Sequence, residues 1–134
     1  MLFLYHVIIL IITIFSPIII FYRVLKNKED KKRYIEKFSI SSKKRLKGKL
    51  IWFHGASVGE ILSIVPLIRN YEKNRSIAQI LITSSTLSSS NVLQKFKFKK
   101  TIHQFYPIDN FFLTSRFLKF WKPNLILWIE SDIW

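Results

Sequence analysis

The stretch "IWFHGASVGEIL", residues 51–62, decides how the rest of the chain is interpreted. A short apolar run ends at His54, a loop of small residues follows, and Glu60 stands at the start of an apolar pattern with helical spacing. A buried strand, a tight loop and a helix in this order begin an α/β unit. We therefore expect a strand over residues 49–54 and a helix that includes residues 61–68.

Three further apolar runs have the composition of buried strands, over residues 79–83, 101–106 and 124–129. Two segments with helical spacing separate them, around residues 92–96 and over residues 111–121. Four strands that alternate with three helices predict a parallel, doubly wound α/β sheet of Rossmann type. Pro66, inside the first helix, predicts a kink or a later helix start.

Ligands bind at the carboxyl ends of the strands in sheets of this kind. This rule places four segments along one edge: residues 55–60, residues 84–90, residues 107–109 and Glu130. Glu60 and Glu130 are therefore expected to face the same crevice. Two simpler interpretations remain open. Glu60 could only complement a helix dipole, worth about 0.3–1 kcal/mol, and the hydroxyl-rich residues 84–90 could be a solvated loop and a helix N-cap.

The first 22 residues form an apolar segment with no charged side chain before Arg23. As a helix it would span roughly 30 Å, the thickness of a bilayer core. A cleaved signal peptide would have a basic start and a small-residue cleavage site, whereas here basic residues follow the apolar run. We therefore predict an uncleaved membrane anchor helix over residues 1–22.

Positive charge is concentrated directly after this predicted anchor. Residues 23–49 contain twelve Lys and Arg and three acidic residues, which is nine of the formal net charge of +14. This predicts a basic juxtamembrane linker, residues 23–48, against an anionic membrane surface, with the domain of residues 49–134 facing the cytoplasm. No nucleic-acid-binding motif accompanies the charge, so we expect no nucleic acid partner. The absence of cysteine excludes disulfides and fits a reducing compartment.

Four motifs, in this order along the chain, resemble those of the Kdo transferases (3-deoxy-D-manno-octulosonic acid transferases). These are inner-membrane glycosyltransferases that add Kdo to a lipid A precursor. The motifs are "SVGE" (57–60), "TSSTLSSS" (83–90), "IHQFYPID" (102–109) and "WIESDIW" (128–134). In the last, Asp132 and Ile133 depart conservatively from the family pattern. The resemblance covers the whole chain, including the apolar N-terminus and the basic linker.

The resemblance implies the acceptor half of a B-type glycosyltransferase fold, and an inverting reaction that needs no metal and no cofactor. It implies that Glu60 is the general base and that Glu130 stabilises the transition state. It also implies acceptor-binding residues in two loops: Ser57, Val58 and Gly59, and Thr83, Ser84, Ser85 and Thr86. The donor, CMP-Kdo, would be bound mainly by a second domain, in the same or a separate chain, so we expect the isolated chain to be inactive.

Two alternatives remain beside a transferase. A glycoside hydrolase would use Glu60 and Glu130 as an acid/base pair and would need no nucleotide donor. A non-catalytic membrane module would bind lipid or a partner and would show no transfer with any donor domain. The transferase interpretation explains why a carboxylate stands at a helix start, because transfer to an alcohol needs a base that stays ionised.

Overall fold

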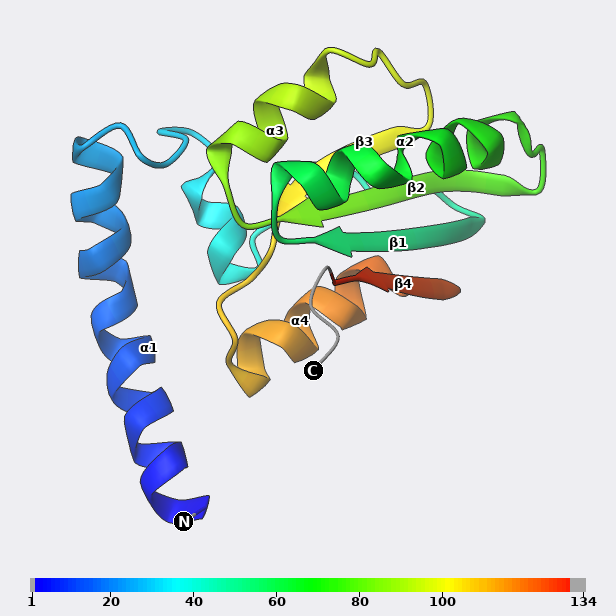
Figure 1. Cartoon of the computed structure of the whole chain (residues 1–134). Coiled ribbons are helices and arrows are strands. Elements are labelled where there is room, and N and C mark those ends of the chain that lie inside the picture. The colour runs from blue at the N-terminus through cyan, green and yellow to red at the C-terminus, as the bar shows by residue number, and fades with distance from the viewer. Residues whose placement is uncertain (1, 131–134) are drawn as a thin grey trace.

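The computed structural model describes residues 2–130 of the chain (Figure 1). Within these residues, a long helix α1 (Leu2–Leu25) and a short 3-10 helix η1 (Tyr34–Phe38) precede an α/β domain. Its strands are β1 (Lys49–Gly55), β2 (Ile77–Ser84), β3 (Thr101–Phe105) and β4 (Leu125–Ile129). Its helices are α2 (Val58–Lys73), α3 (Leu87–Gln94) and α4 (Phe111–Trp121).

The sheet is parallel throughout, with the strand order β3-β2-β1-β4. Helices α2 and α3 lie on one face of the sheet and α4 lies on the other (Figure 1). This is a doubly wound arrangement, and it confirms the predicted fold class. Because β1 and β2 are covered on both faces, almost every one of their side chains is buried, which is why they appear in the sequence as continuous apolar runs.

Successive side chains of β1 enter two different hydrophobic cores. Ile51 and Phe53 pack with residues of α2 and β2 in the larger core. Leu50 and Trp52 point to the opposite face, where they pack with Phe117 of α4 and its neighbours in the smaller core. Because successive side chains of β1 point to opposite faces of the sheet, this one strand packs against the helices on both faces.

Helix α2 includes the predicted residues 61–68, but one alternative for its start and the predicted start of α3 differ from the structure. Helix α2 runs from Val58 through Pro66, so the prediction of a later start at the proline is wrong. Helix α3 begins at Leu87, five residues before the predicted segment, because the Thr86 side chain caps it by accepting a hydrogen bond from the backbone N–H of Ser89 (3.2 Å). Most of the hydroxyl-rich segment is therefore a helical turn and not a loop.

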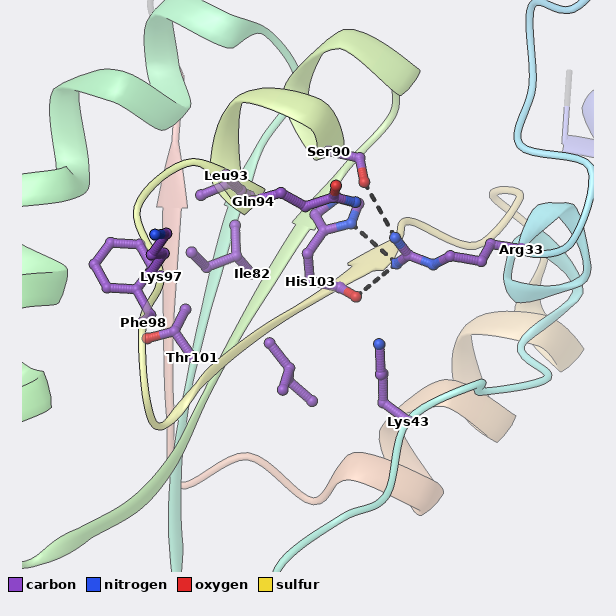
Figure 2. A pocket seen from close by; sticks show the side chains of 11 residues that line it. Arg33, Lys43, Ile82, Ser90, Leu93, Gln94, Lys97, Phe98, Thr101 and His103 are labelled. Atoms are coloured by element: carbon purple, nitrogen blue, oxygen red, sulfur yellow. Dashed lines mark hydrogen bonds between the residues drawn. The ribbon is translucent and has the colours of Figure 1, made fainter.

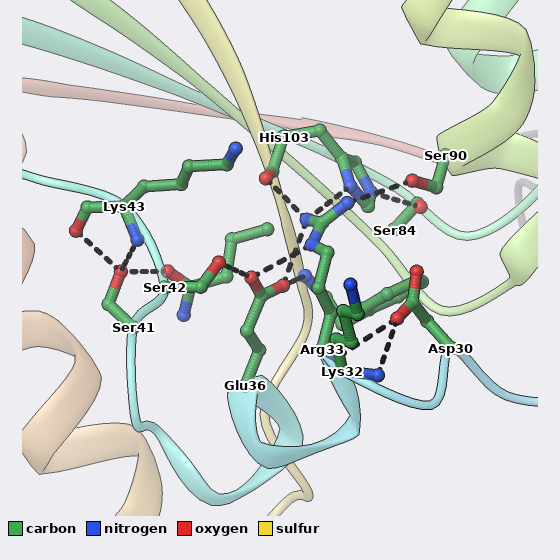
Figure 3. A network of polar contacts seen from close by, with 12 residues as sticks. Asp30, Lys32, Arg33, Glu36, Ser41, Ser42, Lys43, Ser84, Ser90 and His103 are labelled. Carbon is green, nitrogen blue, oxygen red and sulfur yellow. Dashed lines mark hydrogen bonds and ion pairs between the residues drawn. The ribbon is translucent and has the colours of Figure 1, made fainter. Parts of the chain in front are cut away.

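The basic segment between α1 and β1 is held against the edge strand β3 by a buried carboxylate (Figure 3). Glu36 of η1 is fully buried and accepts hydrogen bonds from Arg33 (2.9 and 3.0 Å), from the Ser42 hydroxyl and from the backbone N–H of Phe105 (2.9 Å). Arg33 also donates to the carbonyl oxygen of His103 (2.6 Å). The edge of the sheet is therefore covered in part by the segment that follows α1.

Helix α1 stands beside the domain, on the side toward which the strands point (Figure 1). Within residues 2–130 it is the one helix long and apolar enough to cross a membrane, with a mean hydropathy of 2.5 over an 18-residue window inside Phe3–Leu25. Its hydroxyl at Thr13 accepts a hydrogen bond from the Asn110 side chain (3.1 Å), just before α4. The apolar helix and the carboxyl ends of the strands therefore lie on the same side of the molecule.

Candidate active site

The strand order creates a switch point between β1 and β4. From β1 the chain moves outward to β2 and β3, and it then crosses back to place β4 on the other side of β1. Gly55, the last residue of β1, is the register partner of Ile129, the last residue of β4. Ligands of open α/β sheets bind in the crevice at such a point, and here Glu60 and Glu130 follow the two strands that form it.

Glu60 belongs to a complete capping box at the start of α2. The Ser57 hydroxyl accepts a hydrogen bond from the Glu60 backbone N–H (3.2 Å). In return, Oε2 of Glu60 accepts from the backbone N–H groups of Ala56 (2.7 Å) and Ser57 (3.4 Å). The Ser-x-x-Glu spacing of residues 57–60 is the sequence signature of this motif, so the capping box is encoded in the sequence itself. The carboxylate therefore folds back over the loop at the edge of the crevice.

The two glycines of this loop have different structural roles. A Cβ atom at Gly55 would meet Cδ1 of Ile61 at 3.0 Å and Cβ of Glu60 at 3.3 Å, so glycine allows α2 to pack closely on β1. A Cβ at Gly59 would meet only Oγ of Ser57, at 4.0 Å. The chain itself does not require a glycine at position 59. Its missing side chain leaves space over the first turn of α2.

His54 is buried below the crevice, where the negative charges of Glu60 and Glu130 both act on its imidazole ring. It is 5% exposed at the end of β1, with Nδ1 2.8 Å from the Thr83 hydroxyl and its ring against Tyr106 and Trp128. Burial lowers the pKa of His54, while the charges of Glu60 and Glu130 act in the opposite direction. The sequence interpretation of His54 as a structural residue agrees with its hydrogen bond, but it missed the proximity to both acidic side chains.

The residues that the resemblance assigns to acceptor binding divide into exposed and buried groups. Ser57 and Gly59 are exposed at the first loop, and Val58 is partly exposed. In the second loop Ser85 and Thr86 are exposed, whereas Thr83 and Ser84 are fully buried. The Thr83 hydroxyl accepts a hydrogen bond from the Trp52 indole (2.8 Å), and the Ser84 hydroxyl lies 2.7 Å from Nε2 of His103. Glu130 is exposed, and residues 131–134 of the fourth motif lie outside the described residues.

An apolar cavity of about 310 Å³ lies next to this crevice, on the α4 face of the sheet. Aromatic side chains from three strands or their ends form its wall, namely Trp52, Tyr106 and Trp128. Helix α4 contributes Phe117 and Leu118. The two carboxylates at the crevice are thus close to a hollow that suits an apolar group.

A second cavity, of about 220 Å³, lies at the opposite edge of the sheet, between α3 and β3 (Figure 2). Arg33, Lys43, Lys97 and His103 are among its lining residues. The Arg33 guanidinium donates hydrogen bonds across this cavity to the Ser90 hydroxyl (3.1 Å) and to the carbonyl oxygen of His103 (2.6 Å). Because Arg33 is also paired with the buried Glu36, we assign it a structural role here.

A parallel sheet with its switch point at β1 and β4, after an N-terminal apolar helix, is the architecture of the amino-terminal half of a B-type glycosyltransferase. Comparison with known families agrees with this class. The family described as 3-deoxy-D-manno-octulosonic-acid transferase (kdotransferase) matches residues 32–134. The chain belongs to this family.

Individual relatives carry the same name. A 3-deoxy-D-manno-octulosonic acid transferase of Rickettsia bellii is 42% identical over 117 residues, which are 87% of this chain and 28% of that protein. A probable mitochondrial 3-deoxy-D-manno-octulosonic acid transferase of Arabidopsis thaliana is 38% identical over 122 residues, 89% of this chain and 27% of that protein. The chain thus spans about a quarter of the length of these curated relatives. No solved structure matches the chain significantly.

Proposed function

We propose that the chain is the acceptor half of an enzyme that transfers Kdo from CMP-Kdo to a lipid A precursor. The observation that carries the proposal is the position of Glu60, which lies within the residues that the family matches and in the first turn of α2, directly after one of the two strands at the switch point. The donor is held mainly by a second domain, from the remainder of a longer chain or from a separate one. No metal and no cofactor take part in the proposed reaction.

Glu60 is the general base in this proposal. The acceptor hydroxyl loses its proton to the carboxylate while its oxygen attacks the anomeric carbon of Kdo, and CMP leaves from the opposite side. The N-terminus of α2 favours the ionised carboxylate that a base must provide. Glu130, at the end of the neighbouring strand, stabilises the charge that develops in the transition state.

The exposure of the side chains in the two loops indicates which of them contact the acceptor in this proposal. Ser57, Ser85 and Thr86 present hydroxyls at the carboxyl edge, and Val58 and Gly59 leave space for a bulky glycolipid. Thr83 and Ser84 are buried beneath these exposed residues. Their hydroxyls form hydrogen bonds with Trp52 and His103, which hold the start of the second loop in place. The apolar cavity beside the crevice provides a surface for the hydrophobic part of the acceptor.

The proposed location of the protein rests on the apolar helix α1 and on the positive charge of the segment that follows it. We propose that α1 anchors the chain to the inner membrane and that the domain faces the cytoplasm, where the basic segment meets anionic lipid. An acceptor that resides in the membrane then lies on the side of the molecule where the strands end. Location and chemistry support the same function.

A hybrid enzyme tests the proposal. This chain replaces the matching part of the Rickettsia bellii relative, and Kdo transfer from CMP-Kdo to a lipid A precursor is measured in single turnover. Glu60→Gln is expected to lower the rate by about 10²–10⁴-fold, because the amide cannot accept the proton. The amide oxygen can still accept the capping hydrogen bonds, so the thermal midpoint should change little.

Glu72→Gln is the matched control, since Glu72 lies at the far end of the same helix and binds the backbone N–H groups of Lys99 and Lys100. Its transfer rate should equal that of the unaltered hybrid. A near-normal rate in Glu60→Gln would show that Glu60 is a cap and not a base. An unaltered hybrid without transfer, assayed beside an active Rickettsia bellii enzyme, would favour the non-catalytic membrane module.

A further inference from the structure

Two neighbouring phenylalanines at the start of α4 are almost fully exposed. Phe111 is 77% exposed and Phe112 is 78% exposed, more than any other large hydrophobic residue described outside α1. Their rings contact each other edge to face, with centroids 5.8 Å apart, and thus form one continuous apolar tip. Exposed apolar surface of this kind commonly marks a contact with a membrane or a partner.

The tip lies beside the apolar helix. Asn110 caps α4 by accepting a hydrogen bond from the backbone N–H of Phe112 (2.9 Å). The amide group of the same side chain donates to the Thr13 hydroxyl of α1 (3.1 Å). The first turn of α4 is therefore fixed at the level of the middle of α1, and Figure 1 shows α4 extending from there away from α1.

Positive charge follows the tip along the same face of α4. Arg116 and Lys119 stand four and seven residues after Phe112, which places all three on one side of the helix. Both basic side chains are exposed. Aromatic residues at the tip, followed by cations, match the change from acyl chains to anionic headgroups at a bilayer surface.

We propose that Phe111 and Phe112 form a second membrane contact beside α1, inserted into the same anionic bilayer. The contact of Asn110 with Thr13 places the tip beside the exposed apolar surface of α1, so a bilayer that takes up this surface also reaches the tip. The contact does not depend on transferase activity.

Labelling by single cysteines tests this directly, because the chain contains no native cysteine. Phe112→Cys is labelled with an environment-sensitive NBD group in the full chain. Ile8→Cys in α1 is the positive control. Leu62→Cys is the negative control, because Leu62 is 44% exposed and belongs to α2, which lies on the face of the sheet opposite α4. Vesicles of phosphatidylcholine and phosphatidylglycerol are added, with and without a spin-labelled lipid as quencher.

The NBD emission at position 112 should become brighter and shift to shorter wavelength, and the spin-labelled lipid should quench it, as at position 8. Position 62 should show neither change. A label at position 112 that behaves like the label at position 62 overturns the proposal. A brighter label at position 112 that the lipid quencher does not reach also overturns it, because the tip is then covered by protein.

A substitution gives an independent measurement. Phe111→Ser combined with Phe112→Ser should weaken partitioning into these vesicles by at least about tenfold, since removing one buried phenylalanine side chain has an effect of this size. Leu62→Ser combined with Leu67→Ser removes a pair of exposed apolar side chains from α2 and should leave partitioning unchanged. Equal partitioning of the two double variants would contradict the proposed contact.

Discussion

At the scale of single residues, Glu60 is a helix cap in the structure and the general base in the proposed reaction, and these two roles depend on different properties of its carboxylate. As part of the capping box it needs only an oxygen that accepts hydrogen bonds from Ala56 and Ser57. As a base it would need its negative charge. A glutamine retains the first property and loses the second, which is why the proposed experiment can separate them.

The surroundings of His103 predict that the stability of the protein depends on pH. Arg33 can only donate, so Nδ1 of His103, 3.1 Å from the guanidinium, must be unprotonated. Burial, together with the charges of Arg33 and Lys43, lowers the pKa of His103 to about 3. The unfolded chain, with a pKa near 6.5, therefore binds more protons below pH 6.5 than the folded chain does.

The free energy of unfolding should consequently fall as the pH decreases from about 6.5 toward 3. His103 alone should account for a loss of roughly 2 kcal/mol between pH 6.5 and 5, and His54, whose pKa is also lowered, adds to it with the same sign. Urea unfolding in detergent micelles at both pH values measures the difference. In His103→Gln, which cannot titrate, most of the slope should disappear, and an unchanged slope would contradict the assignment.

At the scale of elements, the decisive contact is the docking of η1 on β3. The basic residues after α1 would repel one another in a free linker, but Glu36 and Glu29 pair with several of them inside the fold. Glu36 also satisfies the backbone N–H of Phe105 on the open edge of the sheet. The segment therefore protects an edge strand and orients the chain between α1 and the domain.

Removing this carboxylate should be costly. Glu36→Ala leaves the guanidinium of Arg33 and the backbone N–H of Phe105 without their acceptor, and breaking one partner of a buried ion pair costs about 3–5 kcal/mol. Arg23→Ala is the matched control, because Arg23 is 45% exposed and Lys37 still pairs with Glu29. Its cost should stay below about 1 kcal/mol. Thermal or urea unfolding of the two variants checks the difference, and equal losses would show that η1 is not essential to the fold.

At the scale of the whole molecule, exposed lysines on the two ends of the domain should differ in their effect on membrane binding. Lys28, Lys31 and Lys32 lie in the basic segment directly after α1, and all three are exposed. Lys73, Lys95 and Lys99 lie near the ends of α2 and α3 and before β3, at the other end of the strands. Replacing either set by glutamine changes the net charge by the same amount.

The first replacement should weaken binding to anionic vesicles at low salt, at about 1 kcal/mol for each lysine near the surface, and the second should not. The difference should shrink as the salt concentration rises, since the Debye length falls to about 10 Å at 0.1 M. Sedimentation with vesicles measures both. Equal weakening by the two sets would mean that only the net charge matters, and that the basic segment has no special orientation toward the membrane.

The sequence by itself determined the apolar N-terminal helix, the four strands and the class of the fold, although β4, which was expected to be buried, is exposed or half-buried along its whole length. These features depend on local patterns: β1 and β2 are apolar on both faces, and Ser57 with Glu60 starts a helix at a fixed spacing. The start of α3 at Leu87 was also encoded locally, in the preference of Thr86 for a helix cap, but the helix was predicted too late, around residues 92–96.

Only the tertiary structure decided which of these elements meet. The strand order that places β4 beside β1 brings Glu130 to the crevice of Glu60, and no local pattern contains this order. The same is true of Glu36 against Phe105, 69 residues apart, and of Asn110 against Thr13, 97 residues apart. The shared crevice of Glu60 and Glu130 was expected from the ends of the strands. Contacts at such separations depend on how the whole chain closes around its two cores, so they and the phenylalanine tip emerge only in the folded molecule.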